Sequence, residues 1–312
     1  MYRARTGKTP LLEGVNLKKL RFAEPGKGKM WSSFNPSISK NPDGKLAVVF
    51  RSSNYLLGQY QNYANLTVGT AIRNRVFFAD VNEKLDMENF REVEFLGEYR
   101  RGVEDCRLLW RNGSWHFLGV IWETKHTPVP RVGLFKYDEK KSVAKLIEKY
   151  EGPEPKRTEK NWGALAMGES SEFDFIYDTE RVYKNGKLVK LSRPRKKYGH
   201  IRGGTQLIDW EDGYLAIVHV TSKTTERVLN PGTFSYQDAH FRDYTHLFVK
   251  YDLQGNLVGV SSEFIFDIGW IEFASGLVQV GDKLVISYGV DDASMSFFVV
   301  DVAVVRKMLR KV

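Results

Sequence analysis

The sequence predicts an all-β protein, a five-bladed β-propeller with a short C-terminal helix, and three observations lead to this fold class. A pattern in which a polar cluster precedes an apolar strand occurs five times along the 312 residues. Two-residue hairpin turns, such as Asn112-Gly113 and Asp212-Gly213, separate alternating apolar runs. Hydrophobic residues make up 42% of the chain, enough for one packed β core. Repeated strand–turn–strand units of this size are typical of propellers.

The five copies of the pattern have a fixed order but a variable spacing. Their polar segments are Asn35-Pro36-Ser37-Ile38, Glu104-Asp105-Cys106-Arg107-Leu108, Lys160-Asn161-Trp162-Gly163-Ala164, Gly203-Gly204-Thr205-Gln206-Leu207-Ile208 and Ala274-Ser275-Gly276-Leu277-Val278. Variable spacing indicates insertions, which propellers carry in loops. In a propeller these segments meet at one end of the central channel, so residues distant in sequence form one site.

The remaining elements follow from the same pattern. Residues 1–30 are expected to form an irregular N-terminal arm, and residues 31–312 a single propeller domain. The longest insertion, Thr221 to Asp243, is a candidate lid. The stretch from Val304 to Arg310 is predicted to be helical, and shorter helical segments are expected at 82–89 and 140–147.

Charge and cysteine content limit the setting and the partners. The net charge of +9 favours anionic partners such as phosphates, nucleotides, nucleic acid or acidic glycans. The run from Arg181 to Arg202 has no acidic residue, and is either a solvated hairpin face or a dock for a polyanion. Cys106 is the only cysteine, and no apolar run has the length of a signal peptide or a membrane span. We therefore expect a cytoplasmic protein with no membrane span.

The second copy carries adjacent carboxylates, Glu104 and Asp105, ahead of a buried strand. Asp105 is a candidate general acid, because a carboxyl group near like charge or away from water keeps its proton to higher pH. Arg107 would orient Asp105 or bind an anionic leaving group. A purely structural pair between Asp105 and Arg107 is an equally good interpretation.

Cationic residues occur in the first, third and fourth copies. If the copies are equivalent, Arg51, Lys160, Arg202 and His219 gather around the channel. Such groups repel one another unless they surround an anion, most simply a phosphoryl group. In the alternative arrangement they are spread over the rim, each paired with an acid.

The fifth copy supplies further carboxylates. Glu272 begins it, and Asp291 and Asp292 follow its second strand; adjacent aspartates after a strand hold sugar hydroxyls or form a turn. The six histidines are not spaced as zinc ligands, and neither a P-loop nor a dinucleotide fingerprint occurs. We expect neither a metal ion nor a cofactor.

As a set, the motifs resemble the five-bladed propellers of glycoside hydrolase family 130, which contains β-mannoside phosphorylases and a few hydrolases, with mannosyltransferases among related propellers. The matching positions are Asn35-Pro36-Ser37, Glu104-Asp105 with Arg107, Lys160-Asn161, Gly203-Gly204, His219, Tyr288-Gly289 and Asp291-Asp292. Propeller domains associated with bacterial glycosyltransferases are similar at further positions, including 272–277. The likeness covers roughly residues 30–305 and implies that the propeller is a catalytic domain.

The resemblance implies roles for single residues. Asp105 matches the catalytic acid, which protonates the leaving oxygen. Arg51, Lys160 and His219 match the positions that bind phosphate, which attacks the anomeric carbon with inversion. Arg202 and Arg107 are further candidates for binding the phosphate or donor. The candidate sugar-binding residues are Asn35, Glu104, Asn161, Glu272, Asp291 and Asp292.

Two departures from the phosphorylases shape the functional prediction. Cys106 stands where they have proline, and no tyrosine follows shortly after His219. These differences favour, by a small margin, a glycosyltransferase that moves a mannosyl-like unit from a phosphate-bearing donor, a sugar phosphate or nucleotide sugar, to an acceptor such as an anionic glycan or nucleic acid. An inverting β-mannoside phosphorylase, with inorganic phosphate as partner, comes second and a glycoside hydrolase third. The alternative outside the enzymes is a non-catalytic propeller that binds glycan or nucleic acid.

Overall fold

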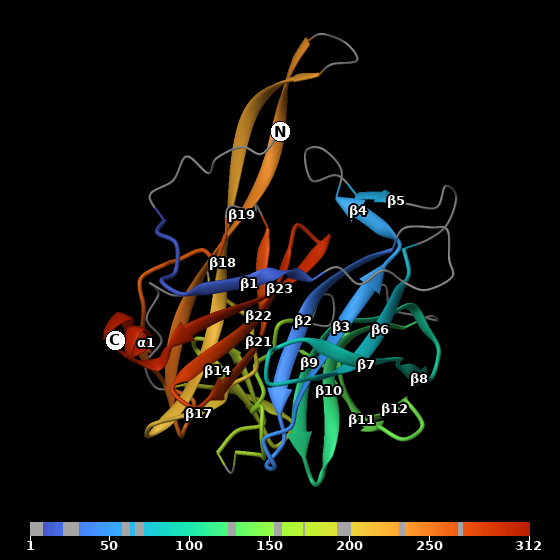
Figure 1. Ribbon diagram of the computed structural model, residues 1–312, viewed down its shortest axis with the longest axis vertical. Helices are drawn as coiled ribbons and strands as arrows, with labels where there is room; N and C mark the ends of the chain where they lie inside the picture. The colour runs from blue at the N-terminus through green and yellow to red at the C-terminus, as the bar shows by residue number, and fades with distance from the viewer. Residues whose placement is uncertain are drawn as a thin grey trace.

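Five β-sheets surround a central axis in this computed structural model (Figure 1). The structure describes residues 9–20, 31–57, 63–65, 72–123, 129–152, 158–170, 172–191, 201–230, 235–267 and 271–312. Each sheet is one blade, with its first strand towards the axis and later strands further out. The predicted all-β five-bladed propeller is therefore confirmed.

The first two blades follow each other along the chain. Blade 1 consists of β2 (Ser32–Lys40), β3 (Leu46–Ser53), β6 (Asn74–Val81) and β7 (Met87–Glu92). Blade 2 consists of β9 (Tyr99–Arg111), β10 (Ser114–Glu123), β11 (Arg131–Asp138), β12 (Val143–Tyr150) and the short parallel strand β8 (Glu94–Leu96). A small ribbon of β4 (Tyr55–Leu57) and β5 (Tyr63–Asn65) extends blade 1 at one end.

The other blades are less regular. Blade 3 consists of β13 (Phe175–Asp178), β14 (Arg181–Lys184) and β15 (Lys187–Lys190). Blade 4 consists of β16 (Arg202–Gly203), β17 (Ile208–Trp210), β18 (Gly213–Asn230), β19 (Ser235–Asp252), β20 (Leu257–Val260) and β24 (Arg310–Lys311). Blade 5 consists of β21 (Glu272–Val280), β22 (Lys283–Val290), β23 (Ser294–Asp301) and β1 (Val15–Leu20).

Both ends of the chain complete blades made mostly by other segments. β1, from the segment predicted as an irregular arm, pairs antiparallel with β23 and forms the outer strand of blade 5. β24 pairs with β20 at the outer edge of blade 4. Pairing at these edges covers backbone groups that a sheet would otherwise leave open.

Of the three segments predicted to be helical, one is a helix and two are turns. The C-terminal helix is confirmed as α1 (Val302–Met308). The helices expected at 82–89 and 140–147 are wrong, because each segment is a turn that leads into a strand. Asn82 Oδ1 accepts backbone N–H groups at 2.9 and 3.0 Å, and Asp138 Oδ1 does so at 3.1 and 3.2 Å, which fixes turns instead of helical caps. Within the described residues, no helix is long and apolar enough to cross a membrane.

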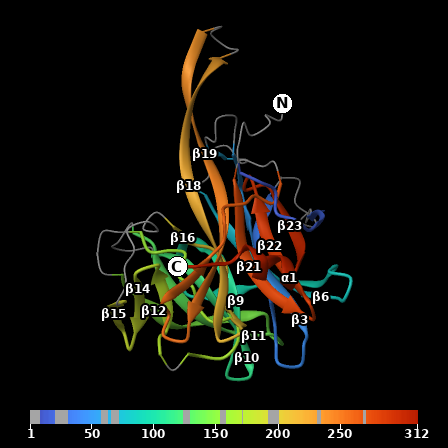
Figure 2. The same ribbon diagram turned by 90° about the vertical axis from the view of Figure 1, so that its left-hand side faces the viewer.

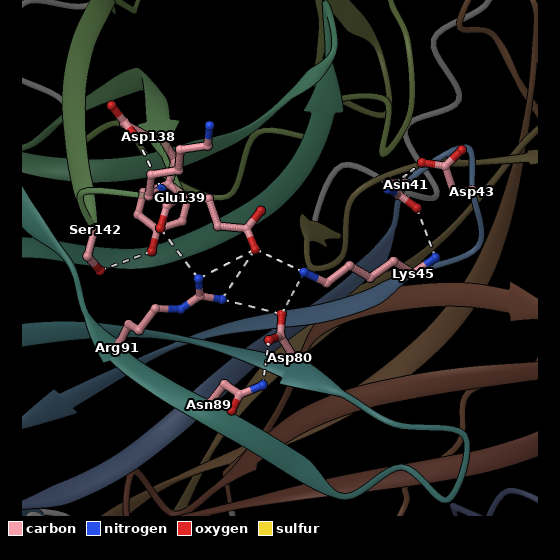
Figure 3. Close-up of polar contacts among 11 residues, drawn as sticks. Asn41, Asp43, Lys45, Asp80, Asn89, Arg91, Asp138, Glu139 and Ser142 are labelled. Carbon is pink, nitrogen blue, oxygen red and sulfur yellow. Dashed lines mark hydrogen bonds and ion pairs between the residues drawn. The ribbon is translucent and has the colours of Figure 1, made fainter.

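The blades are held together by apolar packing inside and by ion pairs outside. Phe78 of blade 1 packs against Phe117 of blade 2, with ring centroids 6.4 Å apart. Further out, Lys45 Nζ lies 2.9 Å from a carboxylate oxygen of Asp80 in blade 1 and 2.9 Å from one of Glu139 in blade 2 (Figure 3). These contacts link neighbouring blades, although exposed ion pairs contribute little stability individually.

Polar side chains fill the centre of the propeller. Gln206, fully buried, donates from Nε2 to the carbonyl oxygens of Ile38 at 2.6 Å and Leu277 at 3.2 Å. Its Oε1 accepts the Ser37 hydroxyl at 3.4 Å, and that hydroxyl oxygen accepts the N–H of Leu108 at 3.0 Å. Buried hydrogen bonds therefore join residues of blades 1, 2, 4 and 5.

Candidate active site

The repeated polar residues sit on irregularities of the backbone at one end of the propeller. Asn35, Asp105 and Asn161 have φ of 52°, 48° and 63°, a left-handed conformation that Asn and Asp adopt more readily than most residues. Around Asn35 and Asp105 the strand register shifts, as expected of a β-bulge that redirects a side chain. The fourth copy has Gly203, where a Cβ would lie 2.0 Å from the carbonyl oxygen of Asn161. The local sequence thus turns these residues towards the axis.

A polar cavity of about 820 Å³ opens at this end and is lined by residues from all five blades. Nine predicted site residues line it: Asn35, Arg51, Glu104, Asp105, Lys160, Asn161, Arg202, His219 and Asp292. The equivalence of the copies therefore correctly predicted which distant segments meet. Three predicted residues, Arg107, Glu272 and Asp291, do not line the cavity.

Asp105 is held as a carboxylate in the ligand-free protein. Its Oδ1 lies 3.3 Å from Arg51 Nε and accepts a hydrogen bond of 2.8 Å from Asn35 Nδ2. Burial by itself raises the pKa of Asp105, but the charges of Arg51 and Arg107 and the Asn35 hydrogen bond outweigh it and hold the pKa below its usual value. The group expected to be a proton donor is therefore ionised until those charges are compensated.

Arg51 connects the two acidic sides of the cavity. Its guanidinium lies 3.5 Å from Glu104 Oε2 and donates to the Tyr55 hydroxyl at 3.0 Å. Tyr55 donates in turn to Asp292 Oδ2 at 3.0 Å. Burial first, and then the charge of Asp105, raise the pKa of Asp292 against the opposing charge of Arg51. Two carboxyl groups in one cavity thus have pKa values displaced in opposite directions.

His219 is a neutral group in this site, whereas the sequence indicated a potential cation. The imidazole is buried, stacked on Tyr244 with ring centroids 5.1 Å apart, and in edge contact with Phe273 at 5.2 Å. Burial, followed by the charges of Lys160 and Arg107, lowers the pKa of His219 to about 3. A neutral imidazole donates one hydrogen bond from whichever ring nitrogen carries the proton.

Lys160 is the most available positive charge in the described part of the cavity. Its side chain is exposed, lines the cavity and makes no hydrogen bond or ion pair with another described residue. It lies close enough to Asp105 and His219 to influence the pKa of each. Arg202, also exposed, lines the same wall at the start of blade 4.

The three predicted residues outside the cavity hold the backbone around it. Arg107 Nε donates to the carbonyl oxygen of Gly204 at 2.6 Å, and another of its nitrogens donates to the carbonyl oxygen of Asp105. Glu272 accepts two backbone N–H groups, at 2.8 and 3.0 Å, and Asp291 Oδ1 accepts the N–H of Ile271 at 2.9 Å. Their contacts with backbone groups of the protein place them behind the cavity wall.

Sequence reasoning missed the aromatic part of the lining. Tyr55, Trp122, Tyr177 and Tyr244 all line the cavity, from strand ends or their flanks. Glu159 joins them as a buried carboxylate that accepts from Tyr177 at 3.2 Å. The one available signal was position, since aromatic residues at the ends of strands that carry polar clusters lie at the channel mouth.

The segment considered as a lid is a long antiparallel ribbon. β18 and β19 pair without a register shift from Gly213↔Asp252 to Asn230↔Ser235, and their distal part projects beyond the propeller (Figure 2). At the base of the projection Thr221 lies opposite Tyr244, and both line the cavity. The ribbon base therefore forms one cavity wall.

Comparisons with known proteins place the fold among mannoside-processing propellers. No protein-family model matches the sequence, and no curated protein matches it. The β-1,2-mannobiose phosphorylase of Listeria innocua, in complex with β-1,2-mannobiose, superposes with a TM-score of 0.62 at 13% identity, covering 92% of this chain and 94% of the other.

Two further structures give the same result. A mannose phosphorylase of Leishmania mexicana, in complex with phosphate, has a TM-score of 0.54 at 11% identity over 96% of this chain and 92% of its own. A glycosyl hydrolase of Bacteroides ovatus has a TM-score of 0.59 at 14% identity over 97% and 94%. Among the described residues, no group of three or more His, Cys, Asp or Glu side chains is arranged to hold a metal ion. The expected likeness to mannoside phosphorylase propellers is thus confirmed in the fold.

Proposed function

We propose that this chain is a glycosyl-transferring enzyme, an inverting phosphorylase that moves a mannosyl-like unit between a sugar acceptor and phosphate. The observation that carries the proposal is the shared cavity of Asp105, Lys160 and His219, in which a carboxylate faces an unpaired ammonium and a neutral imidazole. The ammonium of Lys160 offers hydrogen-bond donors to an oxyanion, while the single N–H of the neutral His219 ring is engaged by the backbone at Gly203. The fold neighbours support this choice, since two of them are named as mannoside phosphorylases.

In the proposed reaction, phosphate bound beside Lys160 and His219 attacks the anomeric carbon from the face opposite the leaving oxygen. The carbon–oxygen bond to the acceptor sugar breaks with its electron pair on that oxygen, and Asp105 supplies the proton. The products are the free acceptor sugar and a sugar 1-phosphate of inverted configuration. Asp292 and Asn161 also line the cavity, and in this proposal they bind hydroxyl groups of the sugar.

Phosphate binding itself would prepare Asp105 for this role. Arg51 and Lys160 are among the charges that keep its carboxyl group ionised. An oxyanion beside them offsets their field, so the pKa of Asp105 rises and the group takes up a proton that it then donates. A larger fraction of Asp105 would therefore carry a proton in the complex with phosphate than in the phosphate-free enzyme, which disfavours hydrolysis by the latter.

This choice reverses the narrow preference of the sequence for a transferase that uses a nucleotide sugar. The neighbours are named for mannobiose, mannose and phosphate, and their names lend no support to a nucleotide donor or a nucleic acid acceptor. Among the described residues that line the cavity, the number of carboxylates equals the number of arginine and lysine side chains, which gives a diphosphate less excess positive charge than the net charge suggests.

The proposal is tested by incubating the full chain with β-1,2-mannobiose and inorganic phosphate and following ³¹P NMR. The expected result is a new resonance from a sugar 1-phosphate, in a reaction that Asp105→Asn abolishes. Synthesis in reverse, from mannose 1-phosphate and mannose, should release phosphate. If neither direction yields product with any manno-oligosaccharide, phosphorolysis is excluded.

Hydrolysis is the second candidate, and the opposite pKa displacements of Asp105 and Asp292 favour it. An inverting hydrolase needs one ionised carboxylate to activate water and one protonated carboxyl group to protonate the leaving oxygen. Asp105 would be the base and Asp292, held by Tyr55, the acid. Release of reducing sugar at the same rate with and without phosphate would establish this reaction instead.

A further inference from the structure

A further positive charge lies in the wall of the same cavity, on blade 2. Near the start of β9, the guanidinium of Arg101 lies over the indole ring of Trp122, 4.3 Å from its centroid. Both side chains are partly exposed and both line the cavity. The pair presents a positive charge and an aromatic ring to one opening.

Within the described residues, no carboxylate neutralises Arg101. Among the described residues, Arg101 stacks on Trp122, and its carbonyl oxygen accepts a hydrogen bond of 2.9 Å from Asn74 Nδ2. Arg51, in the same cavity, lies within 3.5 Å of two carboxylates. An uncompensated charge in a concave site attracts anions more strongly than one on an open surface, because field lines concentrate there.

The backbone holds Arg101 firmly in this position. Gly102 has a φ of 80°, and a Cβ there would lie 2.3 Å from the carbonyl oxygen of Asn74. Asp105 is four residues further along β9, so at about 3.3 Å per residue the Cα atoms lie roughly 13 Å apart or less. Arg101 and Asp105 thus line the same cavity from two points along one strand.

We propose that Arg101 and Trp122 form a subsite for a negatively charged sugar, so that the substrate is an acidic saccharide. The inference rests on the proposed glycosyl transfer at Asp105 and specifies its substrate class. A guanidinium binds the carboxylate of a uronate or the phosphate of a sugar phosphate through paired hydrogen bonds. The indole ring packs against the apolar face of the same sugar.

Equilibrium binding to the full chain tests the subsite without any turnover. The probes are methyl mannoside, the methyl glycoside of mannuronic acid with its carboxylate free, and methyl mannoside 6-phosphate, titrated calorimetrically at low ionic strength. We expect at least one charged probe to bind about tenfold or more tightly than the neutral one, because a charged hydrogen bond contributes more than a neutral one. The comparison between uronate and phosphate identifies the anion.

Two variants and one control locate the effect. Arg101→Gln should remove the preference for the charged probe, and Trp122→Ala should weaken all three probes. Arg75→Gln is the matched control: Arg75 also lies over an aromatic ring, that of Phe77 at 5.4 Å, but Glu92 neutralises it and it lies outside the cavity lining. This control should retain the preference.

Three results would overturn the inference: equal binding of charged and neutral probes, binding of none of them, or a preference that survives Arg101→Gln. In each case the stacked pair is only a packing contact. Failure here is distinct from failure of the proposed reaction. Phosphorolysis of neutral mannobiose with no preference for charged probes refutes the subsite alone. A preference for charged probes without phosphorolysis of either neutral mannobiose or a disaccharide that carries the preferred anion refutes the reaction alone.

Discussion

Replacing Asp105 with asparagine should have two opposite effects, loss of turnover and tighter binding of phosphate. Asparagine keeps an oxygen that accepts the hydrogen bond from Asn35, so the cavity wall should keep its shape. It supplies no acidic proton, and loss of a general acid lowers the rate by about 10²- to 10⁴-fold. It also removes a negative charge from beside the cations that bind phosphate.

The size of the second effect follows from the geometry around Arg51. The Asp105 carboxylate already lies 3.3 Å from Arg51, so a phosphate that contacts the same guanidinium lies close to that carboxylate. Two unit negative charges roughly 6 Å apart repel by about 1.4 to 2.8 kcal/mol at effective dielectric constants of about 40 to 20. Removing one of them should therefore tighten phosphate binding about tenfold to a hundredfold.

Isothermal titration with inorganic phosphate at pH 7 measures this change directly. Asp209→Asn is the control, because Asp209 is an exposed residue of β17 outside the cavity lining; its phosphate affinity should equal that of the unaltered protein. Unchanged or weaker phosphate binding by Asp105→Asn would refute the reasoning, since it would mean that phosphate does not approach Asp105.

Three other predictions concern protonation, stability and the shape of the site. Because the pKa of His219 is lowered to about 3, the unfolded chain binds a proton between about pH 3 and 6.5 that the folded chain excludes. The free energy of unfolding should therefore rise with pH across this range. In urea titrations, His219→Gln should make that rise with pH smaller. Gln206→Leu should lower the unfolding free energy by about 2 to 6 kcal/mol, since two buried hydrogen bonds to carbonyl oxygens are lost; an unchanged urea midpoint would contradict this. Gly289→Ala should reduce activity more than thermal stability, because its Cβ would lie 2.2 Å from Asn35 Oδ1; full activity would show that this contact is unimportant.

The fold and the inner ring of the site were predictable because both depend on the same local feature. Asn35 and Asp105 adopt positive φ at bulges of inner strands, Asn161 adopts positive φ outside any strand, and all three line the cavity. The equivalence of the copies then brings together residues that are far apart in sequence. The polar residues of the repeat thus predicted which segments line the cavity.

The roles of the other residues depend on information that no short sequence pattern carries. Glu272 and Asp291 carry carboxylates, which commonly bind sugar hydroxyls, but their oxygens accept hydrogen bonds from nearby backbone N–H groups. Tyr244 reaches His219 only through the register of β18 and β19. The protonation of His219 depends on burial, which the sequence does not specify for a single residue.

The buried contacts of Gln206 have a consequence for the order in which the fold assembles. Gln206 bonds to Ser37 and Ile38, 169 and 168 residues away in the sequence, and to Leu277, 71 residues away. Contacts between such distant residues form only after long loops have closed, so these bonds should form late in folding. Gln206→Leu should therefore accelerate unfolding more than it slows folding in stopped-flow measurements.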